Sequence, residues 1–377
     1  MIKMRITIIL FFVLPLFAAA QRWKKIKVIP GDITIIRNRG GQTLGYYKKS
    51  GVKIIVDDGF AFKDLNKNGK LDPYEDWRLP ADTRAKDLAS KMSIEQIAGL
   101  MLYSKHQPIP AAAGGPFAGT YHGKPFPESG AAASDLSDQQ IEFLTRDNVR
   151  HVLITSVKDA ATAAQWNNNE QSLAESLGLG IPANNSSDPR NGTTANAEYN
   201  AGAGGSISMW PGSLGMAASF DPGLVRNFGH IAAEEYRALG ISTALSPQVD
   251  LATDPRWIRV SGTFGENPAL SADMARAYID GFQTSTGRKE IAGGWGYASV
   301  NTMVKHWPGG GSGEGGRDAH YAYGKYAVYP GHNFTQLLTP FTEGAFKLQG
   351  KTKMSAAVMP YYTISVNQDA KRGENVA

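Results

Sequence analysis

From residue 81 onward, short apolar segments alternate with longer amphipathic ones. Segments with β-branched and small apolar residues predict strands, and segments with helical periodicity and capping residues predict helices. The predicted strands cover residues 99–103, 151–155, 181–184, 241–245, 297–304 and 356–359. The predicted helices cover residues 82–92, 93–100, 137–146, 159–177, 221–239, 271–283 and 333–348, and residues 105–136 are predicted to form a long loop.

This alternation of strand and helix predicts a parallel sheet in an α/β fold. The pattern gives about six βα units, whereas a closed (β/α)8 TIM-like barrel needs eight. We therefore predict an incomplete (β/α)8 TIM-like barrel over residues 81–377, preceded by an N-terminal extension over residues 21–80. The extension contains short β-like pieces, such as residues 52–56.

Residues 1–20 have the pattern of a cleavable secretory signal peptide. Two early positive charges precede a short apolar run that ends in three alanines, so we predict cleavage before Gln21. The apolar run is shorter than the ~20 residues that a membrane-spanning helix needs. We therefore expect a periplasmic or secreted protein with no membrane span after signal cleavage.

The composition excludes several classes of function. The net charge of +5 is modest and is not concentrated in a basic block with interleaved aromatic residues, so a nucleic-acid partner is not expected. The chain has no cysteine, which excludes disulfides, thiol catalysis and cysteine-ligated zinc. The 42 glycines cluster in loops without a repeat, which favours a loop-rich enzyme over a fibre.

Residues 64–75 match the twelve-residue calcium loop at every fixed position. Oxygen-bearing side chains stand at loop positions 1, 3, 5, 9 and 12, and glycine stands at the sharp turn. The predicted ligands are Asp64, Asn66, Asn68, Lys70 (through its backbone carbonyl), Asp72 and Glu75. The segment lacks two clear flanking helices, and two Asn in place of Asp lower the charge. The alternative is a polar Asn-Gly turn held by side-chain hydrogen bonds.

The candidate for the functional centre is the strand at 297–304 with the Lys305-His306 pair that follows it. Ligand sites of α/β sheets and barrels lie at the C-terminal ends of strands. Adjacent strand residues normally point to opposite faces, so both side chains would share a pocket only if the strand end were bulged or twisted. The alternative is a solvated lysine and a structural histidine before an ordinary glycine turn.

Two other polar loops follow neighbouring predicted strands. One carries Asp188 and Arg190, and the other runs from residue 246 to residue 268 and includes Arg259. If these strands are neighbours, the loops converge with Lys305 and His306 on one face. Charged groups of both signs beside tryptophan suit a ring of hydroxyl groups, so we predict a sugar-binding cleft.

At these residues the chain resembles glycoside hydrolase family 3, the exo-acting β-glucosidases and their relatives. The resemblance covers residues 60–365 and rests on SPQVDLATDPRWIR, GENP, KHWPGGG and the segments around Asp188 and Trp210. It implies a (β/α)8-like barrel followed by an α/β sandwich, and retaining hydrolysis of terminal β-linked sugars without a catalytic cofactor. It also implies that Asp188, Arg259, Lys305 and His306 bind the non-reducing-end sugar of an oligosaccharide or β-glucoside.

The chain departs from the family pattern at several positions. Thr253, Ile258 and Asn191 stand where Arg, Gly and His are common, and Trp307 and Gly310 replace Phe and Asp. No Ser-Asp-Trp type nucleophile motif occurs in the sequence, and the C-terminal sandwich with the acid/base is not present. We therefore expect this chain alone to be inactive. A non-catalytic glycan-binding remnant, or a β-xylosidase or N-acetylglucosaminidase, remains the alternative.

Overall fold

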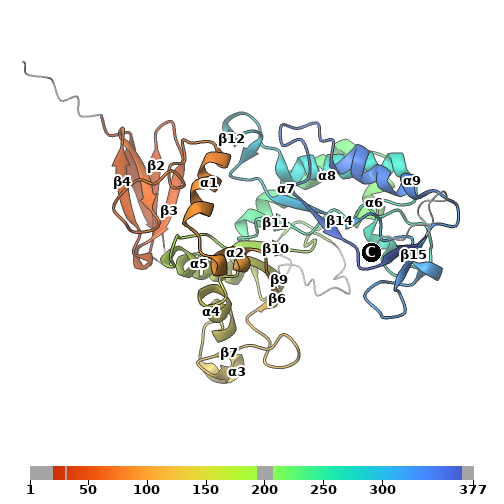
Figure 1. The fold of residues 1–377 in the computed structure, drawn as a ribbon, viewed down its shortest axis with the longest axis horizontal. Coiled ribbons are helices and arrows are strands. Elements are labelled where there is room, and N and C mark those ends of the chain that lie inside the picture. Colours follow the sequence, from red (N-terminus) through yellow and green to blue (C-terminus); the bar gives the residue numbers. More distant parts are fainter. Residues whose placement is uncertain (1–19, 30–31, 193–206, 367–377) are drawn as a thin grey trace, which may run out of the picture. The chain divides into compact units, whose positions relative to one another are not determined.

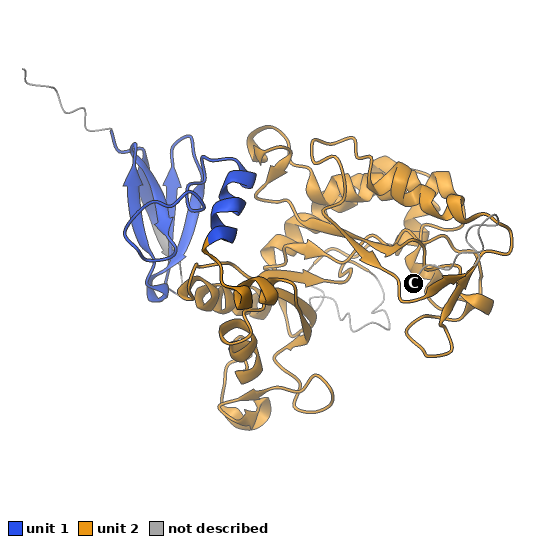
Figure 2. Ribbon diagram, viewed as in Figure 1, with its two compact units in different colours: residues 1–90 blue, residues 91–377 orange. Residues whose placement is uncertain are grey.

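The computed structural model describes residues 20–29, 32–192 and 207–366. The chain divides into two compact units, residues 1–90 and residues 91–377, which are coloured separately in Figure 2. Residues 1–19 of the predicted signal peptide lie outside the described part. Among the helices that are described, none combines the length and apolar character needed to cross a membrane.

The N-terminal unit is built from short antiparallel strands. Strands β1 (Trp23–Ile29), β2 (Ile33–Asn38) and β3 (Thr43–Tyr47) form one sheet, and β4 (Lys53–Asp57) pairs with β5 (Phe60–Asp64). A 3₁₀ turn (Lys48–Ser50) follows β3, and helix α1 (Ala81–Lys91) ends at the boundary between the units.

The core of this unit lies between the two strand systems. Phe62 is fully buried and stacks on Trp77 with ring centroids 5.2 Å apart. Buried Asn38 in β2 exchanges two hydrogen bonds with the backbone of Ala61 in β5, at 2.8 and 3.1 Å. An aromatic pair and a satisfied buried amide therefore hold the hairpin against the sheet.

The larger unit contains a parallel sheet of six strands in the order β16-β14-β11-β10-β9-β6 (Figure 1). The strands are β6 (Tyr103–Ile109), β9 (His151–Val157), β10 (Asn184–Ser187), β11 (Thr243–Ala244), β14 (Asn301–Trp307) and β16 (Ala357–Pro360). Their order in the sheet is their order in the chain, as a barrel requires. In the described chain β6 and β16 are the two edges, so the prediction of an incomplete α/β barrel is confirmed.

Helices connect these strands. They are α2 (Ile94–Leu100), α3 (Phe126–Ser129), α4 (Asp138–Thr145), α5 (Ala160–Ser176), α6 (Ser213–Ala217), α7 (Pro222–Ala238), α8 (Pro268–Gln283) and α9 (Phe334–Thr339). A π-helical turn (Pro340–Ala345) extends α9, and 3₁₀ turns occur at Val260–Gly262, Gly287–Lys289 and Glu314–Gly316. The minor strands are β7 (Thr120–Tyr121), β8 (Lys124–Pro125), β12 (Glu290–Ala292), β13 (Trp295–Gly296), β15 (Tyr326–Val328) and β17 (Ile364–Val366).

The long helices agree with the prediction, whereas some strands do not. Capping boxes at Ser93 and Ser137 begin α2 and α4 as expected. The predicted strand 99–103 is wrong, because residues 99 and 100 end α2 and β6 begins at Tyr103. The loop predicted at 105–136 contains most of β6, together with β7, β8 and α3. The predicted helix 333–348 breaks at Pro340 into α9 and the π-helical turn.

Two of the barrel strands lie further along the chain than predicted. Strand β14 covers Asn301–Trp307 rather than 297–304, so the Lys-His pair belongs to the strand itself. Strand β10 covers Asn184–Ser187 rather than 181–184. It consists of polar residues that are buried by hydrogen bonding, as when Ser186 donates to Val152 O in β9 at 2.9 Å. A search for apolar runs cannot find such a strand.

Helices α7 and α8 cross at two glycines. A β-carbon on Gly229 in α7 would lie 2.9 Å from the α-carbon of Gly281, and one on Gly281 in α8 would lie 2.5 Å from the carbonyl oxygen of Arg226. Neither position has room for a side chain. The close crossing places Phe228, Tyr278 and Phe282 in one aromatic cluster of the core.

Candidate active site

The site begins with an ion pair between two barrel strands. Asp188 follows β10 directly, and Lys305 lies near the end of β14. Lys305 Nζ donates to Asp188 Oδ1 at 2.6 Å, and the two side chains are only 6 % and 18 % exposed. Because the strands are parallel, their C-terminal ends meet at one edge of the sheet. The sequence prediction placed both residues there.

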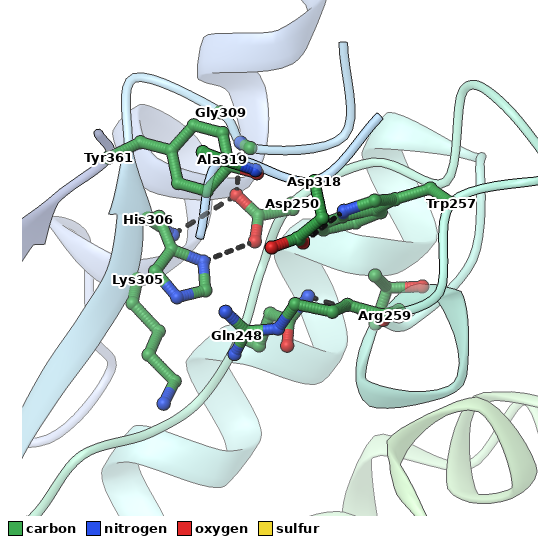
Figure 3. Close-up of polar contacts among 12 residues, drawn as sticks. Gln248, Asp250, Trp257, Arg259, Lys305, His306, Gly309, Asp318, Ala319 and Tyr361 are labelled. Carbon is green, nitrogen blue, oxygen red and sulfur yellow. Dashed lines mark hydrogen bonds and ion pairs between the residues drawn. The ribbon is translucent and has the colours of Figure 1, made fainter. Parts of the chain in front are cut away.

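His306 lies beside Lys305 and is held by a second carboxylate. Its Nδ1 lies 2.7 Å from Asp250 Oδ2, and its backbone N–H donates to Asp250 Oδ1 at 3.0 Å (Figure 3). Both side chains are buried. Burial tends to raise the pKa of Asp250, but the His306 ring and hydrogen bonds from His306 and Gly310 lower it overall. Burial, Lys305 and Arg259 lower the pKa of His306, although Asp250 opposes them.

These directions favour an ionised Asp250 and a neutral His306 near neutral pH. A neutral ring whose Nδ1 faces a carboxylate carries its proton on that nitrogen, which leaves Nε2 as an acceptor. Figure 3 shows Nε2 directed away from Asp250. His306 therefore offers one lone pair in a fixed direction.

A local irregularity allows adjacent strand residues to serve one site. The register between β14 and β16 shifts between Lys305 and Trp307. On the other side of β14, Lys305 bonds to the chain that follows β11. Its N–H donates to Pro247 O at 3.0 Å, and its C=O accepts from Val249 N at 2.8 Å. The strand end is thus bulged, which is the condition under which the sequence predicted that both side chains could be used.

Arg259 and Lys305 line the same cavity as Asp188. The cavity has a volume of about 190 Å³, and its other polar lining residues include Arg190, Asn191, Ser246 and Gln248. Gln248, another lining residue, donates to Arg259 O at 3.4 Å and so holds the turn that carries Arg259 (Figure 3). His306 is not a lining residue of this cavity, although Arg259 is near enough to help lower the pKa of its ring. Three of the four residues predicted to bind sugar therefore line one cavity, and His306 is next to Lys305 in the chain.

Two buried tyrosines hold the loops that carry these groups. Tyr236 in α7 donates to Asp188 O at 2.9 Å and accepts from Arg190 N at 3.2 Å. Tyr278 in α8 donates to Ser246 Oγ at 2.8 Å. Helices on the outside of the sheet therefore fix the turns at its C-terminal edge, where the charged side chains lie.

The glycine run after the lysine-histidine pair serves packing within the chain. A β-carbon on Gly311 would lie 1.8 Å from Leu251 O, and one on Gly310 would lie 3.2 Å from Asp250 Oδ1. Thr253 donates to Gly311 O at 2.6 Å. The glycines therefore bring this loop close to the one that contains Asp250.

The positions that depart from the family pattern fall in different surroundings. Ile258 is 68 % exposed, so the side chain that replaces glycine there extends into solvent. Trp307 meets Phe341 edge-on at 5.3 Å and is part of the core rather than of the cavity wall. Asn191 lines the cavity and donates to Ser208 O at 3.1 Å. Among these, Asn191 is the departure that touches the candidate site.

Sequence reasoning missed three groups that position the site. Asp250 was visible in the motif but received no role, because its partner lies 56 residues away. Tyr236 was read only as part of a helix. Asp318, which accepts from Trp257 Nε1 at 2.7 Å and from His320, anchors the loop after β14. A carboxylate within an otherwise apolar run was the one signal available for Asp250.

A larger cavity of about 660 Å³ lies along β6 in the same unit. Its charged lining residues include Glu142 and Arg146, which form an exposed pair with each other on the surface of α4. Charges that remain in water contribute little to binding. The smaller cavity, with its buried ion pair at the strand ends, is the better candidate.

The predicted calcium ligands lie in the N-terminal unit, between β5 and α1. Asp64 and Glu75 are buried, whereas Asn68 and Lys70 are exposed. In the described residues, no three His, Cys, Asp or Glu side chains are arranged as a ready metal site.

Comparison with known proteins agrees with this architecture. The sequence profile of the glycosyl hydrolase family 3 N terminal domain matches residues 126–361. A periplasmic β-glucosidase/β-xylosidase of Dickeya chrysanthemi is 42 % identical over 318 residues, which is 84 % of this chain and 44 % of that protein. β-Glucosidase C of Emericella nidulans is 38 % identical over 311 residues, with 81 % and 45 % covered.

The chain belongs to glycosyl hydrolase family 3. It spans less than half the length of these two curated relatives. Among solved structures, a β-glucosidase from Erythrobacter marinus superposes with a TM-score of 0.56 at 24 % identity, covering 77 % of this chain and 33 % of the other. At this identity the likeness supports the fold alone.

Proposed function

We propose that this chain carries the sugar-binding part of a retaining, exo-acting β-glycosidase whose substrates are terminal β-glucosides. The observation that supports it most is the nearly buried Lys305–Asp188 pair, which lines a 190 Å³ cavity with Arg259. Burying two charges is costly unless further hydrogen bonds satisfy them. Sugar hydroxyl groups can supply these bonds because each both donates and accepts.

The geometry gives each residue a separate task in the proposed subsite. Asp188 accepts hydroxyl protons, while Lys305 and Arg259 donate to hydroxyl oxygens. His306, oriented by Asp250, is not a lining residue and is assigned the task of positioning Lys305 beside it. Charge-assisted hydrogen bonds from fixed groups hold a sugar ring in one orientation, so the three lining residues position the glycosidic bond but do not break it.

Bond cleavage needs carboxylates beyond those at this cavity. Retaining glycosidases use two carboxyl groups about 5 Å apart, one as nucleophile and one as acid/base. Among the described residues that line the cavity, Asp188 is the one carboxylate, and it is held by Lys305. We therefore propose that the chain of 377 residues binds sugar without hydrolysing it.

Calorimetric titration of the chain with methyl β-D-glucoside tests the binding proposal. Asp188→Asn keeps the shape but removes the charge, and we expect it to weaken binding about 10- to 100-fold. Asp254→Asn is the matched control, because Asp254 forms a surface pair with Arg256 in the loop that carries Arg259. Equal affinity for the wild type and Asp188→Asn would contradict the assignment, and hydrolysis of an aryl β-glucoside by this chain would contradict its inactivity.

A β-xyloside is the second candidate substrate, because the Dickeya relative is named a β-glucosidase/β-xylosidase. Xylose lacks the hydroxymethyl group of glucose, so the two sugars differ by one contact at the cavity wall. Competition between D-glucose and D-xylose in the same titration separates them. Tighter binding of xylose would replace the glucoside assignment.

The proposed location is the periplasm or the outside of the cell. The N-terminal pattern supports it, and so does the periplasmic relative. Sequencing the N-terminus of protein recovered from the exported fraction tests it, and we expect Gln21 as the first residue. Recovery of the full-length N-terminus in the cytoplasm would overturn the proposal.

A further inference from the structure

The loop of residues 64–75 closes on itself at its two ends. It begins where β5 ends, at Asp64, a side chain that is 1 % exposed. It turns at Gly69, whose φ of 78° is in the left-handed region that favours glycine. Asp64 Oδ2 accepts from Gly69 N at 3.0 Å. The carboxyl group at the first loop position is therefore directed across the loop to its sharp turn.

Three further side chains converge at one point of this loop. The amide nitrogens of Asn66 and Asn68 both approach Asp72 Oδ2, at 2.6 and 2.7 Å. A half-turn of each amide exchanges its nitrogen and oxygen. That rotation would set two amide oxygens beside a carboxylate oxygen, and it would give up the bonds that Asn66 Oδ1 and Asn68 Oδ1 accept from Asn68 N and Lys70 N, at 3.1 and 2.7 Å. Such a cluster is repulsive on its own and favourable around a cation.

Glu75 spans the loop from the other side. Its Oε1 accepts from Leu65 N at 2.7 Å and from Asn66 N at 3.2 Å, and its Oε2 accepts from Asp72 N at 3.0 Å. The carboxylate of the last loop position is thus already inside the loop.

A buried atom of Asp64 supplies an independent indication of a ligand. Within the described part of the chain, Asp64 Oδ1 is buried and has no hydrogen-bond partner. Such an oxygen is costly to leave unsatisfied, because it has lost its water without gaining a donor. Asx turns account for the oxygens of Asn66 and Asn68, which accept from Asn68 N and Lys70 N, but they leave this oxygen of Asp64 without a partner. A metal ion inside the loop would satisfy it.

We propose that residues 64–75 bind one calcium ion that holds the N-terminal unit together. The ligands are side-chain oxygens of Asp64, Asn66, Asn68, Asp72 and Glu75, with the backbone carbonyl of Lys70. Calcium takes six to eight oxygen ligands in flexible geometry, whereas magnesium requires a near-ideal octahedron and keeps several waters. On binding, the two amides rotate, and Glu75 exchanges its backbone hydrogen bonds for the ion.

The position of the loop indicates a structural rather than a catalytic ion. Residues on its C-terminal side anchor the unit, because Trp77 stacks on Phe62 and Tyr74 N donates to Asp87 Oδ2 in α1 at 3.0 Å. An ion that fixes both ends of the loop therefore joins β5 to α1. The site lies within the N-terminal unit and does not depend on the proposed glycosidase activity.

Thermal unfolding of the whole chain tests the proposal, first with EGTA and then with CaCl₂ in excess. We expect the melting temperature of the N-terminal unit to rise by about 5–10 °C in 1 mM CaCl₂, and much less in MgCl₂. Terbium is a calcium substitute that Tyr74, next to Glu75, can sensitise. Its luminescence should appear on binding and disappear when calcium is added.

Variants separate coordination from folding. Glu75→Gln and Asn68→Ala should each weaken calcium binding at least about tenfold, because each removes a ligand charge or oxygen. Asn68 is exposed, so Asn68→Ala keeps the fold even if Glu75→Gln does not. Asp82→Asn, at an exposed position of α1, is the control. The proposal is overturned by no shift and no luminescence, or by a calcium response that Asn68→Ala leaves unchanged.

Discussion

In the N-terminal unit the proposed ligand oxygens all come from residues 64–75, whereas at the sugar cavity the charged groups come from residues 188 to 306. The loop is bounded by its own sequence, with an acid at each end and glycine at the turn. At the cavity, Lys305 meets a carboxylate 117 residues away. A contiguous site depends on local turn geometry, and a dispersed site depends on the register of a whole sheet.

The two sites should therefore respond differently to the loss of one residue. Loss of one ligand in the loop leaves its neighbours in place, because the backbone turn at Gly69 still forms. Loss of one partner at the strand ends leaves a buried charge or a buried hydrogen-bond donor unsatisfied, since Asp188 holds Lys305 and Asp250 holds the His306 ring from another strand. The effects of substitutions on stability should therefore stay local in the first unit and extend further in the second.

The largest effect is expected from Asp250→Ala. It removes the partner of His306 and leaves two backbone N–H groups, those of His306 and Gly310, without an acceptor. At about 1–3 kcal/mol for each buried donor left unsatisfied, the loss of this acceptor lowers the free energy of unfolding by roughly 3–5 kcal/mol. Urea titration of the larger unit measures it. Asp254→Asn, which loosens an exposed pair, should cost less than about 1 kcal/mol.

The same variant tests the comparison directly. If the two units respond independently, Asp250→Ala should abolish sugar binding and leave the calcium-dependent transition of the N-terminal unit unchanged. A loss of both would show that the two regions are coupled in stability.

A second, smaller effect is a pH dependence of the free energy of unfolding, which we expect in the larger unit. Burial raises the pKa of Glu170 in α5 to about 8 from an ordinary value of 4.5, against the opposing effects of Asn185 and Arg150. Over that interval the folded protein keeps a proton that the unfolded chain has lost. The free energy of unfolding of the larger unit should therefore decrease by roughly 2–4 kcal/mol as pH rises through this window.

Glu170→Gln should abolish most of that pH dependence, because the amide stays neutral at every pH. The comparison to make is urea unfolding at pH 5 and at pH 8, with Glu142→Gln on the exposed surface of α4 as the control. A slope in Glu170→Gln equal to that of the wild type would assign the dependence to another group.

The smallest effect is expected at Ile258, the family departure closest in sequence to Arg259. Its side chain is 68 % exposed, so Ile258→Ser should change the free energy of unfolding by less than about 0.5 kcal/mol. Sugar affinity should also stay the same. A marked change in affinity would mean that the turn, rather than the strand ends, sets the shape of the cavity.

The sequence was sufficient for the general architecture and for the convergence of the charged loops. Capping residues located the helices well, since they act within one turn. The parallel order of the strands then required Asp188 and Lys305 to share an edge. Strand β10 was misplaced because its buried residues are polar and satisfied by neighbouring chains. Burial of that kind depends on partners that the local pattern does not reveal.

The supporting residues of the site were harder to predict for the same reason. The role of Asp250 is set by a ring on another strand, and that of Tyr236 by a loop on the far side of β10. The bulge at Lys305 was named as a condition but could not be located, because it arises from pairing with the chain after β11. Local sequence specifies what a residue can do, and tertiary contacts decide which of these uses occurs.

The close crossing of α7 and α8 sets a rule for anyone who diversifies this scaffold. In a randomised library, clones with any side chain at Gly229 or Gly281 should be lost, because the β-carbon would overlap backbone atoms of the opposite helix. Gly114, which has open space around it, should accept most replacements. Randomised positions are therefore better chosen in open loops such as that of Gly114 than at the crossing of α7 and α8.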